Sequence, residues 1–208
     1  MSTTGTEKHC RLCLMLSKGG TKACQYFLLK RVKEMPRDSK QNEWTLASFL
    51  NSKKQIIIKS KLSKKKYKVL FPNTGDTVLS NWDLSLPCQV LISYCGLDEF
   101  DRLDIENLRK IRNGLCHMND AEITNLEFES KFKVVQVFVG RILEKLDDND
   151  LKLEVDTIIK ELESGSLSLN DTLDEMRKFY LMEMDIHEKL DHVEEKVLET
   201  HEKLDHDT

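Results

Sequence analysis

Apolar residues recur at steps of three and four along most of this 208-residue chain, which is the spacing of one face of an α-helix. The same spacing predicts helices over 10–16 and 24–32, a helix with Val90, Leu91 and Tyr94 pointing inward, and a helix that begins near Asp101 and carries the stripe Leu108, Ile111, Leu115 and Met118. The cleanest stripe predicts a long helix beyond residue 125, with inward positions at Phe132, Val135, Val139, Ile142 and Leu146. We therefore expect an all-α helical domain over residues 6–147, followed by a connecting amphipathic helix over 151–164.

Glycines and capping residues predict where these helices begin and end. Gly19 and Gly20 are expected to stop the first helix, because glycine adopts backbone conformations that are closed to other residues. One or two helical turns are expected over 44–50, and Asp83 or Ser85 is expected to cap a helix with a proline in its first turn. Two pairs have capping-box spacing before the long helix, namely Asn119 with Glu122 and Thr124 with Glu127.

The C-terminal region over 170–206 has a different, seven-residue pattern. Its apolar seam begins at Phe179 and ends at Leu204, and the hexapeptide His-Glu-Lys-Leu-Asp-His occurs twice, fourteen residues apart. A heptad seam predicts an acidic coiled-coil helix, and we expect self-association into a homodimer through this helix and the helical body. The alternative is that this helix packs back on the body as an ordinary bundle helix.

Charge divides the chain into a basic body and an acidic tail. Residues 1–143 contain 24 Lys and Arg against 15 Asp and Glu, whereas residues 144–208 contain 8 against 21. Eight lysines lie between Lys53 and Lys68, interrupted by isoleucine, leucine and tyrosine. Such a run is either a solvated face or a surface that neutralises nucleic-acid phosphates. The candidate RNA-binding residues are Lys53, Lys54, Lys64, Lys65, Lys66, Arg109 and Lys110.

Several other classes of protein are not supported by the sequence. No apolar run is long enough to cross a membrane and the first residues do not form a signal peptide, so we expect a cytoplasmic protein, with a nuclear one as the alternative. The glycines form no phosphate-binding loop. Cys10, Cys13 and Cys24 near His9 lack the second paired half of a zinc ribbon. We therefore expect reduced cysteines, no metal and no cofactor, and neither a membrane nor DNA among the partners.

The residues with the most chemistry lie at the end of the helix that is expected to begin near Asp101. On a regular helix, Asn113 and His117 face away from the apolar stripe, which favours exposed positions for both. Arg112 and His117 are five residues apart and would be separated by about 140° around the axis. They could converge only if Gly114 loosens the turn, or if two protomers each supply half of a shared site.

The sequence Arg112-Asn113-Gly114-Leu115-Cys116-His117, followed by a polar turn and a long amphipathic helix, resembles the signature of the HEPN superfamily (higher eukaryotes and prokaryotes nucleotide-binding). Residues from about 10 to 146 resemble its animal branch named after the DAZ-interacting zinc-finger ubiquitin ligase. The supporting stretches are 16–21, 27–32, 45–51, 70–72, 82–84, 111–117 and 128 onward. This resemblance implies a helical bundle that dimerises.

The same resemblance implies a metal-independent endoribonuclease with its site between two protomers. His117 would act as general acid and base toward an RNA 2′-hydroxyl, Arg112 would stabilise charge on the phosphate, and Asn113 would orient the site. The alternative is a catalytically silent helical module for interaction or oligomerisation, such as an adaptor in innate-immune or stress signalling. A zinc-dependent adaptor is a third, more distant reading.

Overall fold

The computed structural model describes residues 4–36, 43–60, 62–118 and 122–164, together with Met176 and Phe179. All regular structure within these residues is helical, in agreement with the predicted all-α class. The elements in order are α1 (Gly5–Leu14), η1 (Met15–Gly20), α2 (Thr21–Glu34), α3 (Leu46–Lys59), α4 (Lys64–Leu70), η2 (Leu79–Asn81), α5 (Ser85–Tyr94), α6 (Glu99–Cys116), α7 (Asn125–Glu144) and α8 (Asn149–Ser164). The predicted C-terminal coiled coil lies outside the described residues, apart from Met176 and Phe179.

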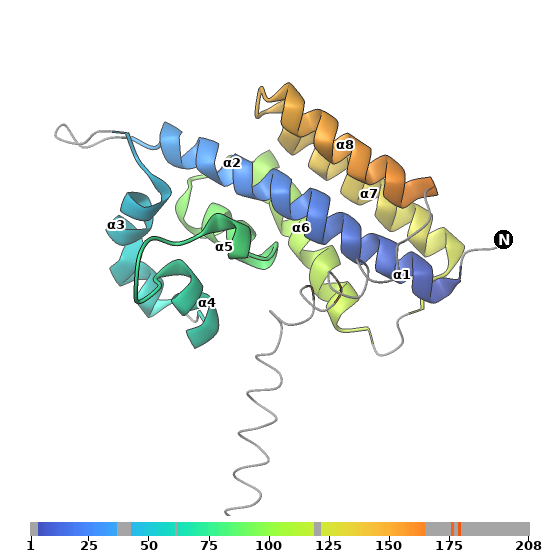
Figure 1. The fold of residues 1–208 in the computed structure, drawn as a ribbon, viewed down its shortest axis with the longest axis horizontal. Coiled ribbons are helices and arrows are strands. Elements are labelled where there is room, and N and C mark those ends of the chain that lie inside the picture. Colours follow the sequence, from blue (N-terminus) through green and yellow to red (C-terminus); the bar gives the residue numbers. More distant parts are fainter. Residues whose placement is uncertain are drawn as a thin grey trace, which may run out of the picture.

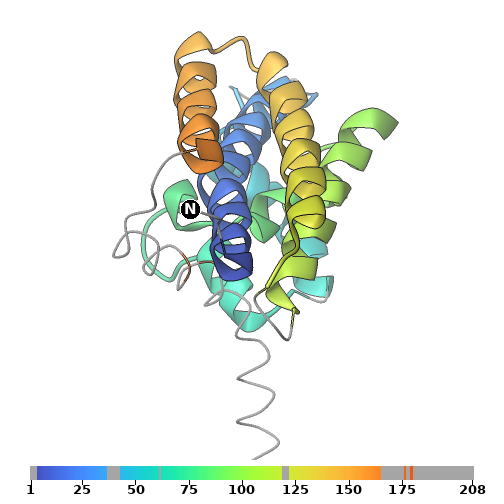
Figure 2. The same ribbon diagram turned by 90° about the vertical axis from the view of Figure 1, so that its right-hand side faces the viewer.

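A continuous rod made of α1, η1 and α2 runs through the bundle, with α7 and α8 beside it (Figure 1). Figure 2 shows α7 and α8 as neighbouring helices flanking the N-terminal part of this rod. Helix α8 packs against η1 and α7 and buries Leu151, Val155 and Ile159, so it shares the core of the body. Helices α3 and α4 lie beyond α5, at the opposite end from α8 (Figure 1).

The glycine pair at positions 19 and 20 does not stop the first helix, contrary to the sequence-based expectation. The chain passes instead through a π-helical turn over Met15–Gly20 into α2. Gly20 has ordinary right-handed helical angles, φ −62° and ψ −45°. A Cβ there would make only ordinary van der Waals contacts, 3.7 Å from Leu16 Cδ2 and 3.8 Å from Leu84 Cδ2, so Gly20 behaves as an ordinary helical residue.

Local caps explain most of the helix boundaries. Thr124 and Glu127 form the predicted capping box of α7, with backbone N–H to side-chain oxygen distances of 3.3 Å in both directions. Helix α3 is longer than the one or two turns expected, because Thr45 and Ser48 form a second capping box from which the helix runs to Lys59. Seven of the eight lysines between Lys53 and Lys68 therefore lie on two helices, α3 and α4.

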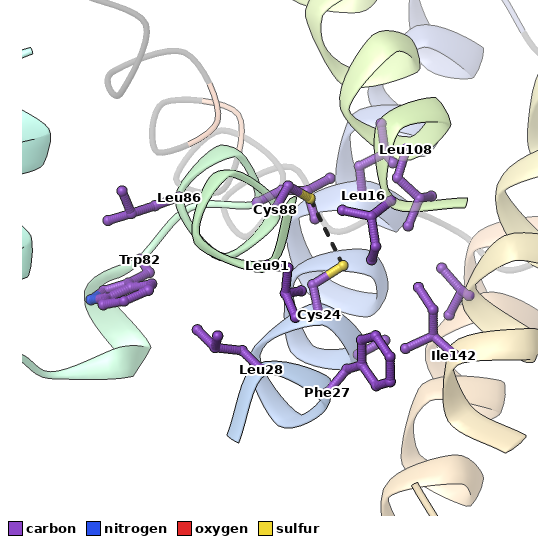
Figure 3. Packing of buried hydrophobic residues seen from close by; sticks show 14 of the residues in the cluster. Leu16, Cys24, Phe27, Leu28, Trp82, Leu86, Cys88, Leu91, Leu108 and Ile142 are labelled. Carbon is purple, nitrogen blue, oxygen red and sulfur yellow. Dashed lines mark hydrogen bonds between the residues drawn. The ribbon is translucent and has the colours of Figure 1, made fainter. Parts of the chain in front are cut away.

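The core joins α2, α5, α6 and α7 (Figure 3). Leu28, Leu91 and Leu108 are fully buried within it, as are two cysteines of facing helices. Cys24 Sγ and Cys88 Sγ lie 4.0 Å apart, and the hydrogen bond between them, followed by burial, raises the pKa of Cys24 well above its usual value. All six cysteines are free thiols. Within the described part of the chain, no helix is long and apolar enough to cross a bilayer.

Candidate functional site

Arg112 lies on the inward side of α6 and is paired with a carboxylate. Its side chain is 1% exposed, and its Nη2 lies 3.1 Å from Oδ2 of Asp83, which is 11% exposed. Ser85 Oγ–H donates to the same carboxylate at 2.8 Å from Oδ2. A buried guanidinium of this kind is tolerated because a counter-charge and hydrogen bonds satisfy it.

The pairing corrects the predicted role of Asp83 and Ser85 as helix caps. The N-cap of α5 is Leu84, which makes no side-chain capping bond. Asp83 faces Arg112 instead. The segment before it is fixed to α2 by Gln25, whose side-chain NH₂ donates to the carbonyls of Leu79 at 2.9 Å and Trp82 at 3.0 Å.

Phe179, which is 67 residues away in sequence, contacts the buried Arg112. The guanidinium Cζ lies 5.4 Å from the centre of the Phe179 ring, and Arg112 Nη2 donates to the Phe179 carbonyl at 3.3 Å. Phe179 is 5% exposed in this single chain. The first position of the predicted heptad seam therefore packs within its own protomer, in a cation–π contact with a buried arginine.

Of the two residues predicted to face away from the core, only His117 is exposed. Asn113 is half-buried and its Oδ1 is 3.5 Å from Arg112 Nη1, whereas His117 is exposed and caps the C-terminus of α6 through its N–H to the Asn113 carbonyl at 3.1 Å. Helix α6 is regular through Gly114 to Cys116, so the turn is not loosened there. The helix thus leaves Arg112 buried and His117 in solvent, and within one chain the two do not share a face.

The candidate RNA-binding residues fall into two separate groups. Lys53 and Lys54 lie on α3 and Lys64, Lys65 and Lys66 on α4. The whole stretch from residue 44 to 75 has eight lysines and no Asp or Glu. Arg109 and Lys110 lie on α6, with α5 between them and the lysine-rich helices (Figure 1).

A groove of about 900 Å³ connects Arg112 with the lysine-rich region. Lys18 of η1, Lys22 of α2 and Lys65 of α4 line it, and Asp83, Arg112 and Phe179 are also part of its lining. Tyr26 of α2, 41% exposed, lines it too. Sequence reasoning missed Lys18, Lys22 and Tyr26, although the steps of four between them mark one helical face. The expected break at Gly19 and Gly20 separated them.

The histidine and cysteines near the N-terminus do not form a metal site in the described part of the chain. His9 is fully buried, and Cys13 Sγ lies 3.4 Å from its Nε2. Burial, and then the charge of Lys131, lowers the pKa of His9. No group of three or more His, Cys, Asp or Glu side chains within the described residues is arranged to hold a metal ion.

Comparisons of this chain with family models, with curated proteins and with solved structures give no match.

Proposed function

We propose that this chain is a helical RNA-binding module of the HEPN type that binds single-stranded RNA through α3 and α4. One observation carries this proposal: the stretch from 44 to 75 contains eight lysines and no acidic residue, and seven of these lysines lie on α3 and α4. Lysines without acidic neighbours in sequence can neutralise phosphates and release bound counterions, which favours binding to an RNA backbone.

The surface between α3 and α4 also has the apolar features that bases need. A hollow of about 490 Å³ is lined by Lys64, Lys68, Tyr67 and Phe71 together with Ile57 and Ile58 of α3. The rings of Tyr67 and Phe71 are 5.0 Å apart, and Lys54 Nζ lies 5.1 Å from the centre of the Phe71 ring. Aromatic rings interleaved with lysines suit stacking of unpaired bases and contact with the adjoining phosphates.

Binding without cleavage is the version of this proposal that the geometry supports best. A catalytic arginine must reach the phosphate, but Arg112 is 1% exposed and already pairs with Asp83 and the Phe179 carbonyl. Releasing it would leave the Asp83 carboxylate without its counter-charge in a mostly buried position, which is costly. We therefore assign Arg112 to the fold and the lysines to RNA.

The test is a fluorescence-anisotropy titration of a labelled single-stranded RNA with the full chain. Replacing Lys64, Lys65 and Lys66 by glutamine is expected to weaken binding by up to about a hundredfold at ~0.1 M salt, because three phosphate contacts are lost. The control variant replaces three exposed lysines of α7 and α8, Lys133, Lys152 and Lys160, and should bind as the wild type does. Equal loss in both variants, or no binding by the wild type, would refute the proposal.

Cleavage is tested on the same RNA in a denaturing gel, with and without EDTA. We expect intact RNA for the wild type and for His117→Ala. EDTA-resistant cleavage that disappears in His117→Ala would instead establish the endoribonuclease, with the composite site that the HEPN resemblance implies.

A second candidate function is that of an interaction or homodimerisation module, and exposed apolar residues favour it. Phe100 is 81% exposed and Leu103 51% exposed, one helical turn apart on α6. On α7, Val134 and Val137 are exposed at the same spacing. Apolar side chains exposed in pairs of this kind favour a protein contact over solvent. Phe100→Glu with Leu103→Glu should lower the mass measured by light scattering if these residues form a dimer contact, and an unchanged mass would exclude them from it.

A further inference from the structure

Phe179 lines the groove of about 900 Å³ that also contains Arg112, and it is the last described residue before the C-terminal segment. Its ring and its carbonyl both contact Arg112, and its side chain is buried and lines the groove. The 29 residues 180–208 follow directly in sequence from Phe179, a residue that lines the same groove as Lys18, Lys22 and Lys65. At about 3.3 Å per extended residue they can reach every part of that groove.

The charges of the two partners are complementary. Residues 180–208 contain ten Asp and Glu against three Lys, a net charge of 3 − 10 = −7. Three lysines line the groove, and its arginine is paired with Asp83. Lys22 is also in contact with Glu154, but the side chains are 30% and 52% exposed, so that pair is weak and exchangeable.

We propose that the acidic segment 180–208 occupies the lysine-lined groove of its own chain and competes there with RNA. The competition rests on the proposed function, whereas occupancy of the groove does not. Lys65 belongs both to the groove and to the lysine-rich helix α4, so the segment and an RNA strand would use the same ammonium group.

Tethering makes even a weak contact effective. A segment linked directly to the groove has an effective concentration on the order of 1 mM. Against a local dissociation constant on the order of 0.1 mM, this concentration weakens the binding of a competing RNA about tenfold. The inhibition should fade as salt rises, because exposed charges are screened beyond about 10 Å at ~0.1 M ionic strength.

Occupancy is tested without RNA, by carbodiimide cross-linking of the full chain. The carboxylate adds to the carbodiimide to give an O-acylisourea, and a contacting lysine amine attacks its acyl carbon to form an amide as the substituted urea leaves. We expect amides between Lys18, Lys22 or Lys65 and carboxylates of 180–208, formed within one chain in a mixture of ¹⁴N- and ¹⁵N-labelled protein and lost in 1 M NaCl. Cross-links of equal yield to Lys133 and Lys152, which do not line the groove, or mainly between labelled and unlabelled chains, would overturn the proposal.

Competition is tested with a full-length variant in which six carboxylates are replaced by amides, at Glu183, Asp185, Glu188, Asp191, Glu194 and Glu195. This variant should bind single-stranded RNA about tenfold more tightly than the wild type at low salt. The Phe179 anchor is unchanged in it. Unchanged affinity would overturn the competition. If neither protein binds RNA while the intrachain amides form, the proposed RNA function is refuted and occupancy of the groove stands.

Discussion

Arg112 and the lysines of α4 carry the same charge in opposite surroundings. The guanidinium of Arg112 is buried between Asp83 and Phe179, whereas Lys64 is exposed in a stretch that contains no acidic residue. A buried, paired charge is already satisfied by the fold and has little left to offer a ligand. An exposed charge contributes little to folding and remains available for phosphates. We therefore assign Arg112 to the stability of the fold and propose that the lysines of α4 bind RNA.

The largest expected effect is on stability, and it tests whether Arg112 is a structural residue. Arg112→Ala should lower the free energy of unfolding by about 3–5 kcal/mol, because it leaves Asp83 mostly buried without its partner. Urea denaturation measures this loss. The double variant Arg112→Ala with Asp83→Ala should lose less than the sum of the two single variants, since the pair is coupled. Loss of less than about 1 kcal/mol in Arg112→Ala would mean that the arginine is not structural.

His9 is also buried, but it has a lowered pKa, so burial here favours the neutral form of the side chain. Burial lowers its pKa below the usual 6.5, so the unfolded chain takes up a proton at a higher pH than the folded one does. Stability that is fully present above pH 6.5 should therefore fall as the pH drops through the interval between 6.5 and the lower folded pKa. Denaturation at several pH values, compared with His9→Gln, checks this. An acid loss of equal size in both proteins would assign it to other groups.

The smallest effect is expected at His117. His117→Ala should change the free energy of unfolding by less than about 0.5 kcal/mol, because its side chain is exposed. RNA affinity should also stay the same, since His117 lines neither the hollow between α3 and α4 nor the groove beside Arg112. A clear loss of RNA affinity with unchanged stability would move the binding surface to the C-terminal end of α6.

The sequence was sufficient for features that depend on local spacing. The apolar steps from Phe132 to Ile142 predicted the buried face of α7, and the Thr124–Glu127 capping box predicted its start. The outward position of His117 was also correct, because α6 is regular up to Cys116.

Features that depend on contacts distant in sequence were not predictable in this way. Asp83 fits the pattern of a helix cap, and only the position of Arg112 beside it shows that it forms an ion pair instead. The groove combines η1, α2 and α4 with residue 179, and no periodicity joins residues so far apart. The burial of Arg112 was not predictable either, because it depends on the ion pair with Asp83.

The most direct test of the division between structural and binding charges is the salt dependence of RNA affinity. The logarithm of the affinity of the full chain for a labelled single-stranded RNA would be measured against the logarithm of salt concentration, for wild type and for the glutamine variant at Lys64, Lys65 and Lys66. We expect the slope of this variant to be shallower by about 2, because three released counterions contribute ~0.7 each on single strands. Replacement of Lys133, Lys152 and Lys160 should leave the slope unchanged. An unchanged slope in the α4 variant would contradict the proposal that the lysines of α4 bind RNA phosphates.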